Sequence, residues 1–423
     1  MKKLYLTMVP GKRISCKCRP EMRVAAPISG KIRVLAEKND EVHSLGEYEI
    51  KGRYALNRIY LDVSMLSGEY IIRVSFSGGA LDLLAEERYT IIDSETNSGQ
   101  LIDGCWVSLY HWSEEEARHF NGELATLTDI DWKHKIYDMH ALGITSVLIQ
   151  NVFYSNEYVN QHSMTMSTYM GAALYPSGLW GKRYPIAASD SVEAILSAAD
   201  QCGMTVFPGI GMYAWFDFST ESLKWHIMVT KELFNRYGHH KSFYGWYISE
   251  EIMGALYHGY PYVPDEKHRD IQNFFREYTA FVRMLTPTKP VALAPNNIDF
   301  HLYEREWLPI LENIDIIIPF AFARFPEKEN IKEIAAICQK TDTHFWVDME
   351  MFRFPLDNGL VPKSFDELIK EIRSYDMLEQ IYGYQYTGIM NAPGFVPRMG
   401  REDTVDLYLE YKQYAKERLG NLL

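Results

Sequence analysis

"FYGWYISEEIMG" (Phe243 to Gly254) begins as an aromatic, β-branched strand and ends in two adjacent carboxylates. Successive side chains of a strand point to opposite faces. One face would carry apolar residues that can pack under helices, namely Tyr244, Trp246 and Ile248. The other would carry Gly245, Tyr247, Ser249 and Glu251. If this second, more polar face looks inward, Glu251 lies at the inner mouth of the sheet and Glu250 points outward.

Seven further segments of this kind alternate with amphipathic segments from Leu101 onward. The strand segments are GCWVSLY, ITSVLIQ, TVFPGIG, FYGWYIS, PVALAP, DIIIPFA, HFWVDME and IYGYQYT. Among the helical segments, Trp132, Ile136 and Met139 fall at i, i+4 and i+7. Eight such units predict an α/β fold, a (β/α)8 TIM barrel with some enlarged loops. An open doubly wound sheet is the alternative, but no glycine-rich phosphate loop follows any strand.

The first 95 residues have a different pattern. Short β-rich runs such as KIRVLAEK, NRIYLDVS, EYIIRVSF and ERYTIID are separated by Ser-Gly and Gly-Gly turns. This punctuation is typical of a small antiparallel sandwich. We therefore predict an immunoglobulin-like β-sandwich domain over residues 1–95, a polar linker at Asp93 to Gln100, and a catalytic barrel over residues 101–423.

Composition excludes several classes of partner. The formal net charge of −13 argues against nucleic acid and anionic membrane surfaces, which require basic patches. No stretch reaches transmembrane length. The five cysteines are scattered and odd in number, which favours free thiols in a reducing compartment. The apolar run at the start of the chain is too short for a signal peptide. We therefore expect a cytoplasmic protein unless a leader has been removed.

The ends of the fourth and seventh strands carry the candidate catalytic groups. On the seventh, Phe345, Val347 and Met349 would face helices, whereas Trp346, Asp348 and Glu350 would face inward. Active sites of TIM barrels lie at the C-terminal ends of the strands, where Glu251 and Glu350 would face each other. One protonated acid and one ionised nucleophile are what a retaining glycosidase needs. Alternatively, each glutamate is simply a solvated strand-end residue.

Other polar and aromatic residues near strand ends are candidates for supporting roles. We expect Asp348 to order nearby hydrogen-bond donors, and Glu250 to cap a turn or pair with a cation. Candidates for substrate binding are Trp112, Tyr213, Trp215, Asn296, Phe352 and Gln385. Amides can bind sugar hydroxyls and aromatic rings can stack on sugar faces, although turn formation and core packing are the alternatives for each one.

The connection from Asn151 to Asp190 is the longest in the barrel region and is rich in tyrosine and tryptophan. Loops of this length in compact domains are usually functional or disordered, and this aromatic content argues against disorder. We predict that it covers part of the barrel mouth and supplies an aromatic wall.

Metal and cofactor chemistry have no sequence support. The thirteen histidines offer no HxH or HExxH spacing, and His239-His240 occupies a polar helix end that we interpret as solvated. No serine lies in a nucleophile-elbow pattern, and no cysteine has an evident histidine partner. We therefore expect no cofactor and no metal, which makes a metal-dependent hydrolase a weak alternative.

The segments GWYISEEI, FWVDMEMF, YGYQYTGIMN and DWKHKIYDMHALGITSVLIQ together resemble glycoside-hydrolase-like barrels catalogued as a bacterial domain of unknown function. More distantly, the arrangement is similar to the clan A retaining glycosidases. The resemblance covers about Leu101 to the C-terminus, and residues 1–95 resemble more weakly the β-sandwich that such barrels often carry. It implies that Glu251 is the acid/base and Glu350 the nucleophile. Clan A enzymes usually place Asn directly before the acid/base, where this chain has Glu250.

The sequence thus predicts a two-domain glycoside hydrolase that cleaves glycosides or oligosaccharides by a retaining mechanism. The competing hypothesis is a non-catalytic carbohydrate-binding barrel, which would keep the aromatic mouth while its carboxylates lie too far apart or are engaged by cations.

Overall fold

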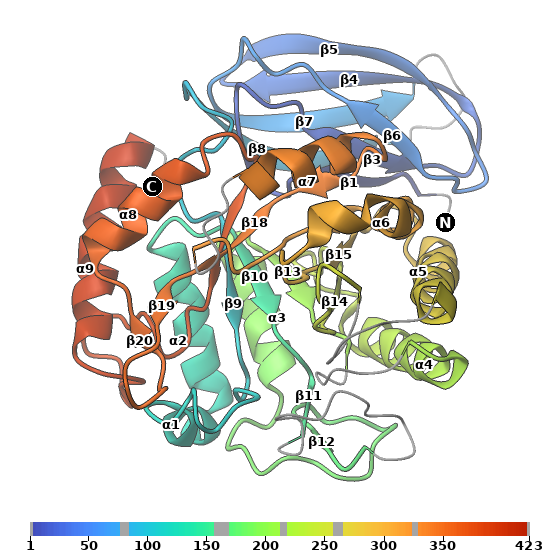
Figure 1. Cartoon of the computed structure of the whole chain (residues 1–423). Helices are drawn as coiled ribbons and strands as arrows, with labels where there is room; N and C mark the ends of the chain where they lie inside the picture. Colours follow the sequence, from blue (N-terminus) through green and yellow to red (C-terminus); the bar gives the residue numbers. More distant parts are fainter. Residues whose placement is uncertain are drawn as a thin grey trace.

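The structure is a computed structural model that describes residues 3–76, 84–155, 169–211, 218–256, 265–323 and 329–420. The first 92 residues form two β-sheets (blue in Figure 1). The three-stranded sheet has the order β1 (Tyr5–Val9), β3 (Glu21–Ala25), β6 (Asn57–Tyr60). The five-stranded sheet has the order β2 (Arg13–Ser15), β8 (Leu84–Ile92), β7 (Gly68–Phe76), β4 (Gly30–Lys38), β5 (Glu41–Ile50).

These two sheets share one hydrophobic cluster. In β4 the buried residues Ile32, Val34 and Ala36 alternate with more exposed ones, as expected for a strand with one face on a core. They belong to the same cluster as Met22 and Val24 of β3 in the other sheet. The pairings are antiparallel except that of β2 with β8, which is parallel.

The rest of the chain is a mixed α/β region with two parallel sheets. One has the order β13 (Thr205–Pro208), β10 (Ser146–Ile149), β9 (Gly104–Val107), β21 (Ile381–Tyr384), β18 (Val347–Glu350). The other has the order β14 (Trp246–Ile248), β15 (Val291–Leu293), β16 (Ile316–Ile317), β17 (His344–Phe345). Every strand segment predicted in this region is present. Single parallel bridges, Val206 to Phe243 and Gly209 to Tyr247, connect β13 with the β14 segment.

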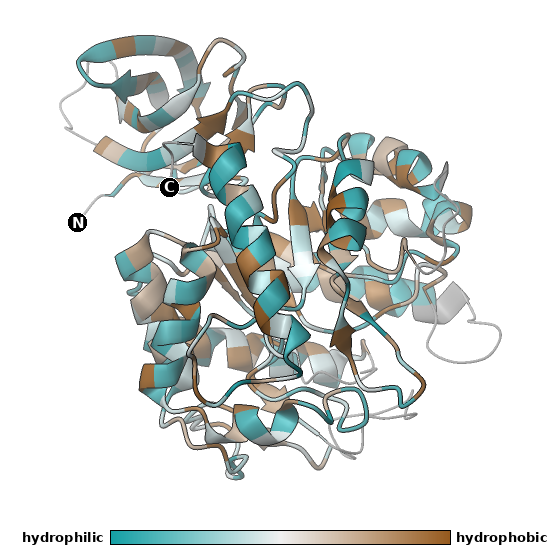
Figure 2. Cartoon of the chain, turned by 90° about the vertical axis from the view of Figure 1, so that its left-hand side faces the viewer, coloured by the Kyte–Doolittle hydropathy of each residue, from teal (hydrophilic) through white to brown (hydrophobic). Residues whose placement is uncertain are grey.

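Helices follow these strands and bury one face against them. They are α1 (Asn121–Thr126), α2 (Asp129–His140), α3 (Ser191–Cys202), α4 (Thr220–Tyr237), α5 (Asp265–Leu285), α6 (Glu304–Leu311), α7 (Glu329–Gln339), α8 (Phe365–Ser374) and α9 (Asp403–Leu419), with a 3-10 turn η1 (Phe300–Tyr303). Trp132, Ile136 and Met139 of α2 are all buried, which confirms the predicted stripe. Hydrophilic and hydrophobic residues alternate along the helices in Figure 2.

Two hairpin-like pairs lie outside the parallel sheets. β11 (Phe153–Tyr154) pairs antiparallel with β12 (Ala172–Ala173), and β19 (Phe352–Arg353) with β20 (Val361–Pro362). The β11–β12 pair lies at the opposite end of the molecule from the first two sheets (Figure 1). Among the described residues, no helix combines the length and the apolar character that crossing a membrane requires.

The parallel strands separate two hydrophobic clusters, which test the predicted alternation. Trp246, Ile248, Phe345, Val347 and Met349 belong to the large cluster that also contains the buried helix residues. A second group, here called the inner cluster, contains one residue of most strands: Trp106, Leu148, Phe207, Tyr247, Ala292, Ile316, Trp346 and Tyr382, together with Val9, Tyr244, Ala294 and Ile318. The alternation predicted for the fourth and seventh strands is therefore confirmed at these positions.

Tyr244 is the exception. It was expected to face the helices, but it belongs to the inner cluster, with its ring 4.9 Å from that of Phe207. Its hydroxyl donates to the backbone oxygen of Met8 at 2.6 Å. Tyr244 lies two residues before β14 begins, so the period of two does not apply to it, and Phe243 takes the helix-facing position instead.

The first two sheets contact the N-terminal ends of the parallel strands. Arg13 bonds Asp103, directly before β9, and Arg23 bonds Asp315, directly before β16. Glu21 accepts a hydrogen bond from His344, the first residue of β17. Val9 of β1 enters the inner cluster. The segment predicted as a linker is bonded to the α/β region, because the Asn97 backbone N–H donates to the Asp376 backbone oxygen at 2.9 Å.

Candidate functional site

At the C-terminal ends of β9, β10 and β21, buried amide and hydroxyl groups form a hydrogen-bond network. The Ser108 hydroxyl lies between the side-chain oxygens of Gln150 and Gln385, 2.5 Å from the latter. The Gln150 amide nitrogen donates to the Tyr384 hydroxyl at 2.5 Å. Ser108 and Gln150 stand two residues after Trp106 and Leu148 of the inner cluster, so they occupy the inward face one layer higher. Gln385, a predicted substrate-binding residue, is fully buried in this network.

His111 extends this network toward the loop after β9. Its Nε2 lies 3.3 Å from the Tyr384 hydroxyl, and its ring stacks on Trp112 with centroids 5.5 Å apart. Burial lowers the pKa of His111 to about 4, against the opposing hydrogen bond to Ser113. At neutral pH the imidazole is therefore uncharged, with one nitrogen that donates and one that accepts a hydrogen bond. Trp112, a predicted stacking residue, is half-buried beside it.

Glu250 and Glu251 diverge at the end of β14. The Glu250 side chain is 1% exposed, and its Oε1 lies 3.1 Å from Nε2 of His226 on α4. His226 Nδ1 lies 2.7 Å from the Ser222 backbone oxygen. Because that oxygen can only accept, Nδ1 is the donor in this contact, and Nε2 faces the Glu250 carboxyl group. Glu250 thus contacts a helix, as predicted for the outward-facing residue.

Gly211 leaves the room that Glu250 occupies. A Cβ atom at Gly211 would lie 2.5 Å from Glu250 Oε1 and 2.8 Å from the Ser249 hydroxyl oxygen. The Gly211 backbone N–H also donates to that hydroxyl at 2.7 Å. Gly211 therefore packs closely against the two residues that precede Glu251.

Tyr247 lies near carboxylates from two strand ends. Burial raises the pKa of Tyr247, the Trp106 contact opposes this, and the charges of Asp348, Glu251 and Glu250 raise it further. Asp348 pairs in register with Tyr382 of the inner cluster, and neighbouring residues of paired parallel strands share a face. Glu251 and Asp348 are therefore within electrostatic reach of the same inward-facing hydroxyl.

Glu350 is 5% exposed and ends β18. It pairs in register with Tyr384, whose hydroxyl belongs to the network described above. By the same rule of shared faces, Glu350 lies on the inward side, beside Tyr384. The charge of Glu251 thus acts on Tyr247, and the backbone of Glu350 is paired with that of Tyr384.

The remaining predicted residues fall into three groups. Phe352 packs its ring 6.0 Å from Tyr384, next to Glu350. Asn296 is 7% exposed, and its Oδ1 accepts from the Ile298 backbone N–H at 2.9 Å, which fits the turn-forming alternative. Tyr213 and Trp215 lie outside the described residues.

The long connection after β10 packs many of its aromatic rings together. Tyr154 and Tyr184 are 4.6 Å apart, and each lies within 4.8 Å of Tyr110. Trp180 contacts Trp225 of α4 at 5.2 Å. The charge of Glu250 is one cause, after burial, of the raised pKa of Tyr169, so this connection approaches the end of β14. Its role as a wall of the mouth stays a prediction.

Sequence reasoning missed Ser108, Gln150, His111 and Tyr384. The signal was present, because the alternation used for the fourth and seventh strands also places polar residues inward after Trp106 and Leu148. His111 carried no such signal, since it lies in a loop beyond the strand.

The α/β region matches a family described as a domain of unknown function, DUF4434, over residues 102–396. The chain belongs to this family. The match confirms the resemblance to a domain of unknown function, whereas the likeness to clan A stays a prediction. No curated protein matches this DUF4434 chain.

Several solved structures are similar to this DUF4434 chain. A protein from Bacteroides thetaiotaomicron VPI-5482, provisionally assigned as an alpha-L-fucosidase, aligns with a TM-score of 0.53 and 18% identity, covering 76% of this chain and 98% of that one. A beta-D-glucuronidase for Dictyoglomus thermophilum aligns with a TM-score of 0.44 and 12% identity, covering 98% and 68%. A GH2 beta-galacturonidase from Eisenbergiella tayi aligns at 0.43 and 12%, covering 98% and 72%. The first likeness shows a shared fold; the other two are too low to support a conclusion.

Proposed function

We propose that this DUF4434 chain is a glycoside hydrolase that uses a retaining two-carboxylate mechanism. The observation that carries the proposal is that the charges of Glu251, after β14, and Asp348, in β18, act on the same hydroxyl of Tyr247. Glu350 ends β18 two residues after Asp348, so strand alternation would place it on the same face. The fold shared with a protein provisionally assigned as an alpha-L-fucosidase supports a glycoside or oligosaccharide as substrate.

The proposed scaffold is a single (β/α)8 barrel over residues 101–423, carrying a β-sandwich domain over residues 1–95. Two bridges join β13 to the β14 segment, and Trp346 alone separates β17 from β18. The pairing of β21 with both β18 and β9 also supports the proposal, because it places the last strand between the first and the seventh strand segments. Glu251 and Glu350 then lie at the end of the proposed barrel where barrel enzymes place their active sites.

In the proposed reaction, Glu350 attacks the anomeric carbon while protonated Glu251 gives its proton to the departing glycosidic oxygen. The glycosidic C–O bond breaks as the bond to Glu350 forms. Glu251, now ionised, then takes a proton from water, and the resulting attack on the same carbon releases the sugar and restores Glu350. Direct attack requires the two carboxyl groups to lie roughly 5–5.5 Å apart.

The alternative is a carbohydrate-binding barrel without catalysis. One observation favours it: Glu250 replaces the Asn of clan A enzymes and is bound to His226, so it is not placed to contact a substrate 2-hydroxyl. An amide–hydroxyl network like that of Ser108, Gln150 and Gln385 could bind sugar hydroxyls in either case.

A panel of aryl glycosides and oligosaccharides tests the proposal, with wild type compared with Glu350→Ala, Glu251→Ala and the exposed control Glu402→Ala. We expect Glu350→Ala to abolish turnover and azide to restore part of it by attacking in place of the carboxylate. Glu251→Ala should slow substrates with poor leaving groups far more than activated aryl glycosides, because only the former need the proton.

Wild-type protein that binds oligosaccharides but hydrolyses none of the panel would favour the binding alternative. Equal losses on both substrate types would remove Glu251 from the acid role. Glu402→Ala should behave as wild type, since its side chain is 87% exposed.

A further inference from the structure

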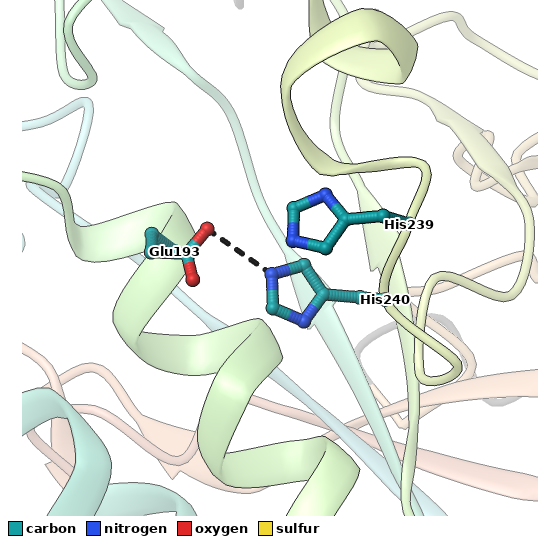
Figure 3. Close-up of side chains that lie close together, drawn as sticks. All are labelled: Glu193, His239 and His240. Carbon is teal, nitrogen blue, oxygen red and sulfur yellow. Dashed lines mark hydrogen bonds and ion pairs between the residues drawn. The ribbon is translucent and has the colours of Figure 1, made fainter.

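Two helices bring three metal-binding side chains together on the flank of the α/β region. His239 and His240 follow the end of α4, and Glu193 lies in the first turn of α3. Their ligand atoms all lie within 4.8 Å of one another, and Figure 3 shows both rings beside the Glu193 carboxylate. The site is distinct from the candidate carboxylates at the ends of β14 and β18. His240 was expected to be solvated, but its side chain is only 6% exposed.

His240 is oriented by a carboxylate behind it. Its Nδ1 lies 2.7 Å from Asp200 Oδ2, and the other oxygen of Asp200 accepts from the Ser242 backbone N–H at 2.6 Å. With Nδ1 donating to Asp200, Nε2 faces Glu193, whose Oε2 lies 3.1 Å away. A carboxylate that fixes one imidazole nitrogen while the other faces a ligand site is the usual support for a metal-binding histidine.

His239 is the group that a simple ion pair leaves unexplained. A protonated His240 between Asp200 and Glu193 would account for those three residues alone. Yet the His239 ring lies 4.2 Å from that of His240, at 37°. No hydrogen bond to another described residue accounts for this placement. His239 is exposed, so its side chain can rotate to bring a nitrogen toward the pair.

We propose that Glu193, His239 and His240 bind one divalent transition-metal ion of the zinc class, with solvent completing the coordination. Two imidazole nitrogens and one carboxylate oxygen suit Zn²⁺ and Ni²⁺, whereas Mg²⁺ and Ca²⁺ prefer oxygen ligands. Ligand atoms around tetrahedral zinc lie about 3.3 Å apart, given bonds near 2.0–2.1 Å. The His240–Glu193 distance already fits, so rotation of His239 is the main adjustment required.

The ion would connect the start of α3 to the segment that leads from α4 into β14. Bound metal stabilises the folded state by mass action, because the unfolded chain does not assemble the three ligands. Zinc at about a hundredfold excess over its Kd should raise the Tm by roughly 3–6 °C for a chain of this size.

Isothermal titration of chelator-treated protein with ZnCl₂ tests the site. We expect one ion per chain with a micromolar Kd, and no comparable binding of MgCl₂. His239→Ala should weaken zinc binding at least tenfold. Because His239 is exposed, the variant should keep the wild-type fold, which circular dichroism would verify. His134→Ala, at an exposed histidine of α2, is the matched control and should bind as wild type.

A second readout uses Co²⁺, whose visible absorption distinguishes four-coordinate from octahedral sites. Wild type should give the intense four-coordinate spectrum, and His239→Ala should lose it. Equal zinc affinity in wild type and His239→Ala, or an octahedral Co²⁺ spectrum in wild type, would overturn the proposal. Neither readout requires glycosidase activity, so the outcome is independent of the proposed function.

Discussion

The two ends of the parallel strands use charge in opposite ways. At the N-terminal ends, buried charges meet partners of opposite sign: Arg13 with Asp103 at 2.8 Å, Arg23 with Asp315 at 2.6 Å, and His344 with Glu21 at 2.9 Å. At the C-terminal ends, carboxylates of like sign gather near Tyr247. Paired charges hold the first two sheets in place, whereas neighbouring carboxylates are costly to bury and are typical of reactive sites.

Substitutions that remove one charge should therefore have opposite consequences at the two ends. Loss of a carboxylate at the C-terminal end relieves repulsion and removes chemistry. Loss of one at the N-terminal end leaves a buried cation without its partner and removes stability. The predictions below rest on this contrast.

The largest effect is expected for Glu350→Gln. If Glu350 is the nucleophile, kcat should fall by at least about a thousandfold, because the amide cannot form the covalent intermediate. The Tm should stay within a few degrees of wild type, since a neutral side chain of the same shape replaces a charge near other acids. Steady-state kinetics and thermal unfolding measure both. A large fall in Tm together with a normal kcat would contradict this prediction, because it would give Glu350 a stabilising and not a catalytic role.

Glu21→Gln should show the reverse pattern. Glu21 is fully buried and contacts His344, Arg58 and Arg23. Its neutralisation should cost about 3–5 kcal/mol of unfolding free energy, because these cations lose their buried counter-charge. Activity per folded molecule should be unchanged. Urea unfolding measures the loss, and Glu47→Gln, at a surface pair with Arg33, should cost much less because water screens that pair.

The pH dependence of stability should come largely from the same place. Burial alone would lower the pKa of His344, but the charges of Glu379 and Glu21, with their hydrogen bonds, raise it from 6.5 to about 9. A raised histidine pKa gives stability that is complete below pH 6.5 and is lost as the pH rises through 9. This rise in the pKa of His344 corresponds to roughly 3–4 kcal/mol of stability at most.

At acidic pH, Glu21 makes a contribution to stability that depends on pH in the opposite direction. Burial would raise the pKa of Glu21, but the His344 hydrogen bond and the Arg23 charge lower it from 4.5 to about 2. Its contribution is complete above pH 4.5 and is lost as the pH falls toward 2. Unfolding free energies measured from pH 3 to 10 should therefore decline on both sides, and His344→Asn should flatten the alkaline decline. An unchanged alkaline decline in His344→Asn would locate the titrating group elsewhere.

The sequence was informative where a local pattern determines structure. Runs such as HFWVDME identify a strand, and the period of two correctly placed Trp346 inward and Met349 toward the helices. It failed at Tyr244, which precedes its strand and contacts Met8 instead of a helix. Side chains alternate between faces only where the backbone has strand geometry. The facing of residues at the start of a predicted strand segment is therefore the least predictable.

The contacts at the N-terminal ends could not be read from the sequence at all. Arg13, Glu21 and Arg23 are charged residues within short β-runs, where a solvated face is the ordinary expectation. Their partners lie 90 to 323 residues away along the chain, so no spacing rule connects them. The same limit hid the Glu193–His240 contact, because Glu193 lies in α3 and His240 lies beyond the end of α4.

The smallest predicted effect concerns a helix start on the C-terminal side of β18. Ser364 forms a capping box with Glu367: its hydroxyl accepts from the Glu367 backbone N–H at 3.4 Å, and the Glu367 carboxylate accepts from the Ser364 backbone N–H at 2.9 Å. Ser364→Ala should cost about 1 kcal/mol of unfolding free energy, because the first turn of α8 loses one of its acceptors. Ser374→Ala, at the other end of the same helix, is the matched control, since its hydroxyl only donates back to the Glu371 oxygen. It should cost less than Ser364→Ala, and both variants should keep full activity. Equal costs would mean that the capping box contributes nothing measurable, whereas lost activity in Ser364→Ala alone would show that the start of α8 also positions Glu350.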